Sequence, residues 1–434
     1  MRVPSSRLVL GFALFTAFVA QSLLAQTTNE RILSIRELGK RNPSVLPVLA
    51  GYLSDPNTDI RLEAVKSIVR IDTPASVDPL VQATHDRDSE IEIRSTDGIV
   101  NAYLPGYVAR TGLTGSLTRG VRQMKSFFSA RNDQVINADV QVRPDVQQAL
   151  ADLVAKGSGD DARANAALAS GILRNRTAVP ALSDALRSKD DDLIFESLVA
   201  LQKIKDPSAG RSVSVLANDL NERIQLTALE TIGVLGSRES APEVRSALSH
   251  ARNLKVRRSA LQTLAMLGQP EDRSTFLNDA ESRDVQIRSS ALEGLGRIRE
   301  PADMPVLQKA FDEGEIDWRI HLAAAFGMVN EGKIDTGEFD PLPFLLECLG
   351  TRGRADTAAA YLTELGNREN VRAALIKMVP TLDKSQKIAL CPVFGKIGTP
   401  DVVETLHTLA KDIDPDVAVA ASQALKTQQS RSQS

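Results

Sequence analysis

Hydrophobic positions along most of the chain recur with the period of an amphipathic helix. In Val256–Gly268 (VRRSALQTLAMLG), the apolar residues Ala260, Leu261, Leu264 and Leu267 stand at positions 0, +1, +4 and +7. On a helix of 3.6 residues per turn, this spacing gathers them in one stripe. The pattern therefore predicts a helix that buries one face and exposes the opposite one.

The same pattern returns at a nearly constant interval. We take as anchor the residue seven positions before the pattern ends, which is Ala260 in the segment above. Successive anchors are 31 to 33 residues apart, except for one interval of 69 and one of 36. The anchors are Arg31, Ala64, Asp97, Ala166, Ser197, Ala228, Ala260, Ala291, Leu322, Ala358, Leu390 and Ala421. A steady period of this length is typical of a repeat array.

A second helical pattern lies between the anchored segments, as in Thr177–Leu186 and Thr399–Leu409. The second of these begins with Thr-Pro-Asp, which reads as an N-cap, a proline in the first turn and an acid at the positive helix end. Glycines follow the anchored helices, and we expect them to end each helix in the left-handed conformation. These glycines are Gly236, Gly268, Gly366 and Gly398. Each unit is thus predicted to be a pair of antiparallel helices.

One helical hairpin cannot bury such a stripe alone, so neighbouring hairpins must stack into a continuous core. We therefore expect an all-α fold, an α-solenoid or superhelix of about twelve stacked hairpins. The chain has 434 residues, 4% of them aromatic. A single compact core rarely exceeds about 250–300 residues, which also favours an array. We expect the first and last hairpins to cap the stack with more polar outer faces.

The Val-Arg-x-x-Ala-Leu-x-x-Leu-x-x-Leu-Gly form of Val256–Gly268, together with Ala-Val-Pro-x-Leu at Ala178–Leu182, resembles bacterial HEAT-like repeats. The resemblance includes the short-repeat class named after phycobilisome lyases. It implies the fold over nearly all of the chain beyond the N-terminal segment. It says little about function, because such arrays serve many roles.

The N-terminal segment has the form of a secretory signal peptide. Arg2 and Arg7 precede an apolar run, Leu8–Ala20, and a more polar stretch ends at Ala25. We expect cleavage near Ala25 and a periplasmic or secreted protein, the alternative being an uncleaved N-terminal anchor. Loss of the two arginines changes the formal net charge from −3 to −5. A net negative charge argues against nucleic acid as the partner.

The expected organisation has five parts. They are a signal peptide (1–25), N-terminal HEAT-like repeats (26–104), a basic Gly/Thr-rich insertion or degenerate repeat (105–142), the main repeat array (143–426) and a disordered tail (427–434). The insertion carries basic residues next to two phenylalanines and, between Tyr107 and Asn132, no acid. Such a segment could dock on an anionic partner or a membrane surface; the alternative is a degenerate repeat with solvated arginines. The candidate docking residues are Arg110, Arg119, Arg122, Lys125, Phe127, Phe128 and Arg131.

An arginine recurs near the start of the anchored helices, and an acid usually precedes it. One hypothesis is an arginine-lined ligand track. The other, which the pattern favours, is a structural ladder that ties adjacent inter-helix turns. The arginines are Arg61, Arg94, Arg163, Arg257, Arg288 and Arg319, and the pattern lapses at Ile194, Gln225 and Ala418.

No arrangement of residues indicates catalysis or a cofactor. None of the four histidines belongs to an HExxH motif or sits beside a plausible Ser or Cys nucleophile, and GxSxG and phosphate-binding glycine motifs are missing. The two cysteines, Cys348 and Cys391, have no metal-type spacing. They could form a disulfide in an exported protein or serve as small buried hydrophobes. We therefore expect a non-catalytic protein without metal or cofactor.

The function that we expect is an exported scaffold that binds a protein or peptide partner on the concave face of the anchored helices. Positions +2 and +6 from each anchor should be exposed on that face, and their charges are mixed. The candidate partner-binding residues are Lys66, Arg70, Lys203, Glu230, Gln262, Glu293, Arg297, Glu364 and Lys396. The alternatives are a bilin lyase or isomerase, implied by the short-repeat resemblance, and binding to a membrane or anionic ligand through the insertion.

Overall fold

The computed structural model describes residues 27–108, 135–137, 139–313, 317–337 and 339–433. The predicted signal peptide and all seven candidate docking residues of the insertion lie outside these ranges. The chain divides into two compact units. Unit 1 comprises Met1–Ile136 and Val142–Ile204, and unit 2 comprises Asn137–Gln141 and Lys205–Ser434.

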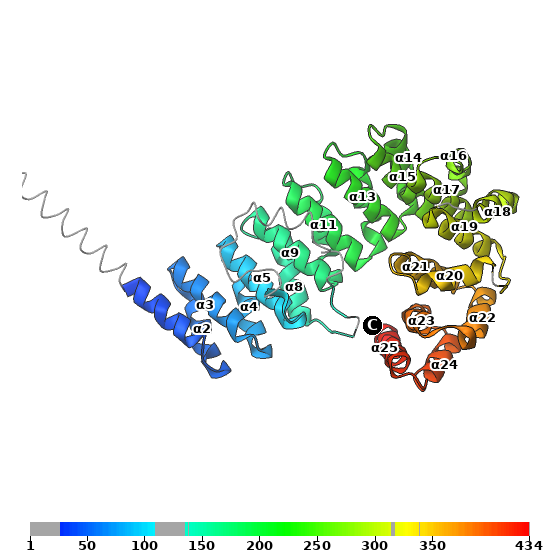
Figure 1. Cartoon of the computed structure of the whole chain (residues 1–434). Coiled ribbons are helices and arrows are strands. Elements are labelled where there is room, and N and C mark those ends of the chain that lie inside the picture. The colour runs from blue at the N-terminus through cyan, green and yellow to red at the C-terminus, as the bar shows by residue number, and fades with distance from the viewer. Residues whose placement is uncertain (1–26, 109–134, 138, 314–316, 338, 434) are drawn as a thin grey trace, which may run out of the picture. The chain divides into compact units, whose positions relative to one another are not determined.

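Unit 1 is built from paired helices in which the second is usually the longer (Figure 1). It begins with a helix over residues 27–38. The pairs that follow are α2 (Leu46–Gly51) with α3 (Thr58–Ile71), α4 (Val77–Ala83) with α5 (Ser89–Tyr103), α8 (Pro144–Lys156) with α9 (Asp160–Ile172), and α10 (Val179–Ala185) with α11 (Asp191–Ile204).

Unit 2 continues the same plan. Its pairs are α12 (Gly210–Ser214) with α13 (Glu222–Leu235), α14 (Ala241–Ser249) with α15 (Leu254–Leu267), α16 (Arg273–Asp279) with α17 (Val285–Ile298), α18 (Met304–Asp312) with α19 (Trp318–Glu331), α20 (Pro341–Leu349) with α21 (Ala355–Leu365), α22 (Glu369–Met378) with α23 (Lys384–Ile397), and α24 (Pro400–Leu409) with α25 (Pro415–Gln433).

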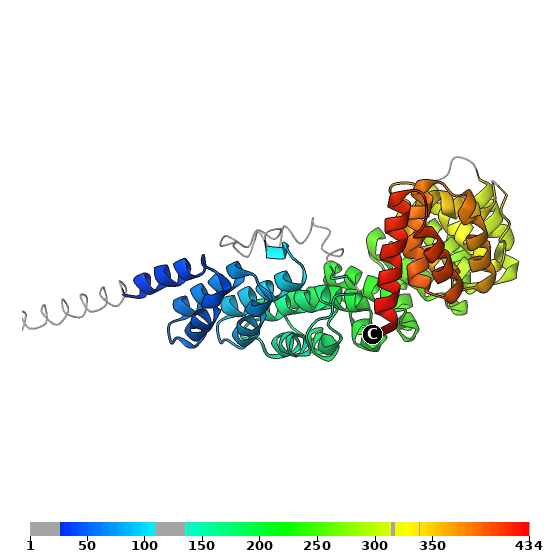
Figure 2. The same ribbon diagram turned by 90° about the horizontal axis from the view of Figure 1, so that it is seen from below.

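Within each unit the helices form two layers. The second helices of successive pairs pack on one another, and the first helices cover them from one side, as Figures 1 and 2 show. Every predicted anchor after Arg31 lies in a second helix, and the regular secondary structure of the described residues is helical throughout. The predicted all-α solenoid is confirmed. Each of these anchors is buried, whereas Arg31, in the helix over residues 27–38, is exposed.

Local sequence signals explain where the helices begin. Asn57 accepts hydrogen bonds from the backbone N–H groups of Asp59 and Ile60 at the start of α3. Asp284 does the same for Gln286 and Ile287 at the start of α17. A side-chain acceptor at this position satisfies N–H groups that have no partner inside the helix.

A helix ends at each of the four predicted glycines, but the expected left-handed conformation is present at only three of them. Gly236, Gly268 and Gly398 have φ angles of 63°, 57° and 69° and end their helices in the left-handed conformation. Gly366 instead has a right-handed φ of −66°. Packing explains why a glycine stands here, because a Cβ at this position would lie 2.3 Å from Cδ1 of Ile397.

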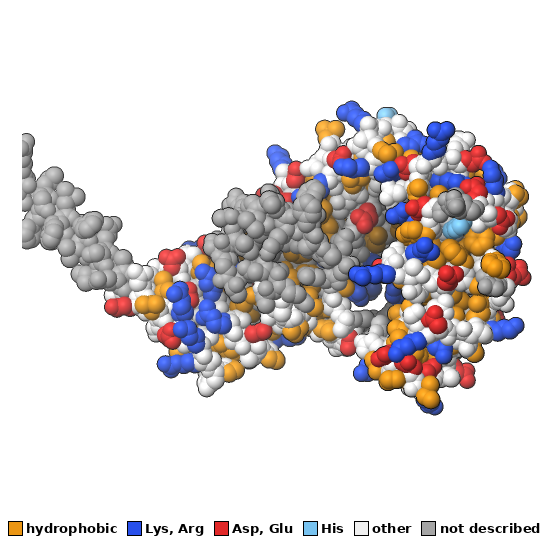
Figure 3. Space-filling view, viewed as in Figure 1, with side chains coloured by type: hydrophobic (Ala, Val, Ile, Leu, Met, Phe, Trp, Pro, Cys, Tyr) orange, Lys and Arg blue, Asp and Glu red, His pale blue; other side chains and the backbone are white. Residues whose placement is uncertain are grey.

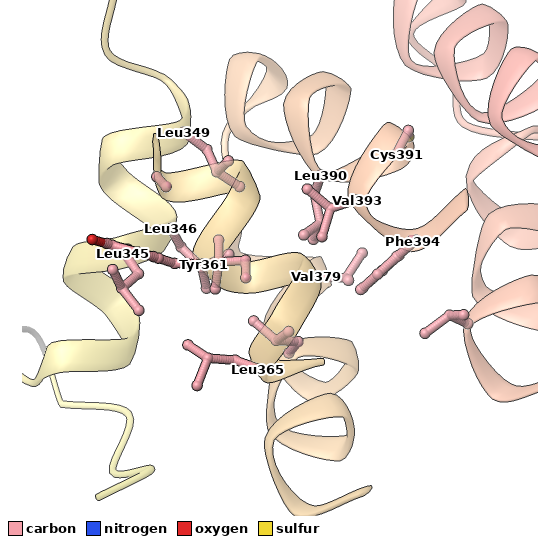
Figure 4. Close-up of a cluster of buried hydrophobic side chains, with 14 of the residues drawn as sticks. Leu345, Leu346, Leu349, Tyr361, Leu365, Val379, Leu390, Cys391, Val393 and Phe394 are labelled. Atoms are coloured by element: carbon pink, nitrogen blue, oxygen red, sulfur yellow. The ribbon is translucent and has the colours of Figure 1, made fainter. Parts of the chain in front are cut away.

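The core of unit 2 near its C-terminal end is a continuous cluster of apolar side chains from α19 to α25. Leu345, Tyr361, Leu390 and Phe394 belong to it (Figure 4). Leu264, which lies in α15 and was predicted to be in the buried stripe, is fully inaccessible to solvent. The hydrophobic ridges of successive hairpins therefore merge into one core, as the repeat pattern requires.

The last helix differs from the sequence prediction at its end. Residues 427–433 were expected to be disordered, but α25 continues as a helix through Gln433. No Gly or Pro interrupts the sequence after Pro415, so nothing stops the helix. Its outer face carries exposed Ser422 and Lys426. Val419 beside them is 68% exposed, so the expected polar cap is only partly realised on this helix, which lies beside α23 in unit 2 (Figures 1 and 2).

Candidate functional site

The recurring arginines form a structural ladder at several repeats. Nε and Nη2 of Arg61 donate to the carboxylate of Asp86 at 2.7 and 3.0 Å, and Nη1 donates to the carbonyl oxygen of Asp55 at 2.9 Å. Arg61 thereby joins the inter-helix turn of its own hairpin to that of the next. Its side chain is buried, with 4% of its surface exposed, so it is not available to a ligand.

Other rungs share this geometry in whole or in part. Arg257 binds Asp279 at 2.9 Å, and Arg288 donates to the carbonyl of Ala280 and to Glu313. The ladder hypothesis is therefore confirmed for Arg61, Arg257 and Arg288. The other three arginines of the pattern contact groups of their own hairpins: Arg94 contacts Glu90, Arg163 the carbonyl of Val154, and Arg319 Asp317. Where the pattern lapses at Gln225, the glutamine side chain donates to the carbonyl oxygen eight residues before it, as Arg288 does.

The predicted partner-binding residues differ in exposure. Five of them, all on second helices, are exposed: Arg70, Glu230, Gln262, Glu364 and Lys396. Lys66 and Arg297 are partly exposed. Lys203 and Glu293 are buried, with 8% and 9% of their surfaces exposed, so the expectation of exposure is wrong for these two.

Close packing of α9 against α11 explains the burial of Lys203. A Cβ at Gly171 in α9 would lie 2.7 Å from Cα of Ala200 and 3.3 Å from Cδ of Lys203. The glycine thus allows the two helices to approach closely, and the aliphatic part of the lysine lies over it. The spacing of apolar residues in one helix does not reveal how near its neighbour comes.

Glu293 is buried for a different reason, because side chains from three helices of unit 2 meet around it. We call Glu293 and Arg297 (α17), Phe326 (α19), and Tyr361 and Glu364 (α21) the clamp cluster. The hydroxyl of Tyr361 donates to Oε2 of Glu293 at 2.8 Å. Nε and Nη2 of Arg297 donate to Oε1 of Glu293 at 3.1 and 2.9 Å, and Nη1 donates to Glu364.

The aromatic rings complete this arrangement. The rings of Phe326 and Tyr361 stack with centroids 4.4 Å apart and an angle of 26° between their planes. The guanidinium carbon of Arg297 lies 5.0 Å from the centroid of Phe326, within the range of a cation–π interaction. The clamp cluster therefore joins α17 to α21 directly, across the intervening α19.

Burial and charge act together in the clamp cluster. Burial, reinforced by the negative charge of Glu293, raises the pKa of the Tyr361 hydroxyl well above its ordinary value. Burial tends to lower the pKa of Arg297, but Glu293 and Glu364 outweigh it and raise the value. The arginine thus stays charged and the tyrosine stays a hydrogen-bond donor. One guanidinium faces the carboxyl groups of both Glu293 and Glu364.

At α19, the second-helix side of unit 2 is covered, and the helix exposes no side chain between Leu322 and Asn330. Every residue from Leu322 to Asn330 is buried, including Ala324 and Met328 at the +2 and +6 positions. A helix that is apolar on all sides is expected to be enclosed. The candidate binding residues of unit 2 therefore do not form one uninterrupted row. Glu230 and Gln262 lie on helices before α19, and Glu364 and Lys396 lie on helices after it.

The sequence prediction missed Tyr361 and Phe326. Tyr361 stands at position +3 from its anchor, where the other second helices of unit 2 have Thr, Gly, Ala or Val. A large aromatic residue at a position otherwise kept small was the available signal. The large Tyr361 side chain reaches past the adjacent second helix, α19, to contact α17.

The histidines do not gather in a pocket. His85, His250 and His407 are exposed on separate hairpins. His321 packs between Phe311 and Phe344, with ring centroids 5.9 and 5.8 Å away, and its Nε2 donates to the carbonyl of Glu313 at 2.8 Å. The face drawn in Figure 3 shows hydrophobic side chains gathered over α18–α20 and charges of both signs intermixed over unit 2.

The described residues contain neither a cluster suited to a metal ion nor a helix suited to a bilayer. No group of three or more His, Cys, Asp or Glu side chains is arranged to hold a metal ion there. Within the same ranges, no helix combines the length and apolar character needed to cross a bilayer. Cys348 and Cys391 are both buried and not bonded to each other. They serve here as small hydrophobic residues of the core.

Comparison with known proteins supports a repeat fold. The model of the HEAT repeats matches residues 17–98 and 212–286. The sequence has no match among curated proteins. Among solved structures, a chain from a study of the cadherin and beta-catenin interaction is 12% identical with a TM-score of 0.41, covering 89% of this chain and 91% of that chain.

Two further similar structures are the complex of CpcE and CpcF of phycocyanin lyase from Nostoc sp. PCC7120 and Kap121p. The first is 17% identical with a TM-score of 0.30 and covers 74% of this chain and 94% of that chain. Kap121p is 12% identical with a TM-score of 0.36 and covers 88% of this chain and 45% of that chain. These likenesses are too weak to transfer any activity or partner. The repeated helical hairpins and the family model that matches these two segments together support a HEAT-like repeat protein.

Proposed function

We propose that the protein is an exported, non-catalytic scaffold that binds a protein or peptide partner on the exposed second-helix surface of its repeats. The observation that supports this most directly is the set of exposed polar side chains on packed second helices. In unit 2 this set consists of Glu230 and Gln262 on helices before α19 and of Glu364 and Lys396 on helices after it. Solenoids present such extended surfaces because each repeat contributes one or two side chains to the same face.

The chemistry of this surface favours a protein over a polyanion. The four exposed side chains are two acids, one amide and one lysine. A partner rich in phosphates would meet repulsion from Glu230 and Glu364 and would gain few of the contacts that dominate nucleic-acid binding. A peptide with both charged and polar side chains matches this mixture better.

Site-specific photo-crosslinking in the native cells tests the binding surface. A benzophenone amino acid at Gln262, on the second-helix layer, should yield a discrete crosslinked product with a second protein. The matched control is Glu404, which is exposed on α24 in the layer of first helices. A product from Glu404 with none from Gln262 would contradict the proposal, and so would a failure to crosslink at both positions.

Export is a separate part of the proposal and needs its own measurement. It is supported by the basic start and the apolar run Leu8–Ala20. Cell fractionation followed by N-terminal sequencing should find the protein outside the cytoplasm and beginning at Gln26. A cytoplasmic protein that retains Arg2 and Arg7 would refute export without affecting the crosslinking result.

A further inference from the structure

The clamp cluster connects helices that are not neighbours in the array. In a solenoid each repeat normally contacts only the repeats before and after it, so stability is transmitted from neighbour to neighbour. Tyr361 and Glu293 are 68 residues apart, and Arg297 and Glu364 are 67 residues apart. Both distances correspond to two repeats, and both contacts pass over α19.

The two arms of the cluster differ in their surroundings. The inner arm is the carboxylate of Glu293, which accepts from the Tyr361 hydroxyl and from Arg297 at a site with 9% exposure. The outer arm is the pair between Arg297 and Glu364, whose side chain is 43% exposed. A buried charge that loses a donor is costly, whereas an exposed ion pair contributes little. The coupling therefore depends mainly on the inner arm.

The enclosed helix α19 makes this coupling cooperative. Ala324 and Met328 are fully buried, although the corresponding positions are exposed or partly exposed in most other second helices of unit 2. Exposing them requires α17 and α21 to move apart, which the Tyr361 to Glu293 hydrogen bond opposes. Release of one flanking helix would therefore also release α19 and loosen the other flanking helix.

We propose that the clamp cluster is a latch that makes α17, α19 and α21 open as one cooperative unit, and that it keeps the second-helix surface closed at α19. The latch acts between next-nearest neighbours, unlike the arginine ladder, which joins adjacent turns. This inference concerns the free protein and does not depend on the proposed partner.

Native-state hydrogen exchange measured by mass spectrometry tests the latch. Tyr361→Phe removes the hydroxyl while retaining the ring that stacks on Phe326. We expect amide exchange to accelerate roughly tenfold to a hundredfold in α17, α19 and α21 together, because the lost hydrogen bond has a charged acceptor. The matched control is Thr363→Val, since the hydroxyl of Thr363 donates within its own helix to the carbonyl of Ala359 at 2.7 Å.

The outcomes separate a latch from a local contact. The proposal is supported if Tyr361→Phe accelerates exchange in α17 and Thr363→Val does not. It is overturned if Tyr361→Phe affects α21 alone. Glu293→Gln provides a second variant, because it weakens the same bond from the other side. Its effect combined with that of Tyr361→Phe should be less than additive, and full additivity would also overturn the proposal.

Discussion

The close approach of α17 and α19 in unit 2 gives a sharp test of the packing. A Cβ added to Gly296 in α17 would lie 2.3 Å from Cα of Gly327 in α19. No rotamer change can relieve a clash with a backbone atom, so Gly296→Ala must push the two helices apart. Overpacking of this kind costs about 3 kcal/mol. Replacing a helical glycine by alanine returns about 1 kcal/mol through backbone entropy, which leaves a net loss of about 2 kcal/mol.

Two other glycines provide controls for the same substitution. Gly233 occupies the same position of the repeat in α13, but its added Cβ would meet the flexible thioether of Met266 at 2.8 Å. The methionine can move aside, so Gly233→Ala should change the free energy of unfolding by less than about 1 kcal/mol. Gly51, at the end of α2, has no atom within 4 Å of an added Cβ. Gly51→Ala should therefore stabilise unit 1 by about 0.5–1 kcal/mol.

Thermal unfolding followed by circular dichroism distinguishes these cases. For a unit of this size, 1 kcal/mol shifts the melting temperature by about 2–4 °C. Gly296→Ala should therefore lower the melting temperature by about 4–8 °C, well beyond the effect of Gly233→Ala. If Gly296→Ala were as stable as Gly233→Ala, the close approach of α17 and α19 would be wrong.

Three further predictions concern burial and ionisation. Leu264→Ala should cost about 2–5 kcal/mol in urea unfolding, because the side chain is fully buried, and a loss below about 0.5 kcal/mol would refute its place in the core. Burial raises the pKa of Glu92 above its ordinary value of 4.5, against the opposing hydrogen bonds from Ser158. The associated stability is present below pH 4.5 and is lost as pH rises through the folded-state pKa, so Glu92→Gln should flatten the pH dependence of stability in that window. Burial raises the pKa of the Cys391 thiol to about 11, so it should react with a thiol reagent only on unfolding, and rapid labelling of the native protein at pH 8 would contradict this.

The repeat could be predicted from sequence because each hairpin carries its own signal. The stripe of Ala260, Leu261 and Leu264 defines a buried helix face without reference to any other repeat. The same holds for Gly236 and Gly398, where the left-handed helix end is a local property of the backbone. These features depend on interactions within one hairpin, and a periodic pattern repeats that information many times.

Features that depend on the distance between repeats could not be predicted in this way. Gly366 ends its helix without the left-handed conformation that we expected, and its lack of a side chain makes room for Ile397 of the next second helix. Glu293 looked like an exposed polar position but is covered by a tyrosine from two repeats away. In both cases the deciding contact comes from a different hairpin. A pattern read along a single helix contains no information about that contact.

The packing of small residues and the clamp cluster are two parts of one arrangement around α19. Gly296 and Gly327 bring α17 and α19 into backbone contact, which shortens the path that Tyr361 must span to reach Glu293. Without such close spacing, an aromatic side chain could not reach across a whole intervening helix. The hydrogen bond between Tyr361 and Glu293 therefore depends on the close helix packing that Gly296 and Gly327 allow. The division of the second-helix surface at α19 follows from where glycines stand in two successive repeats.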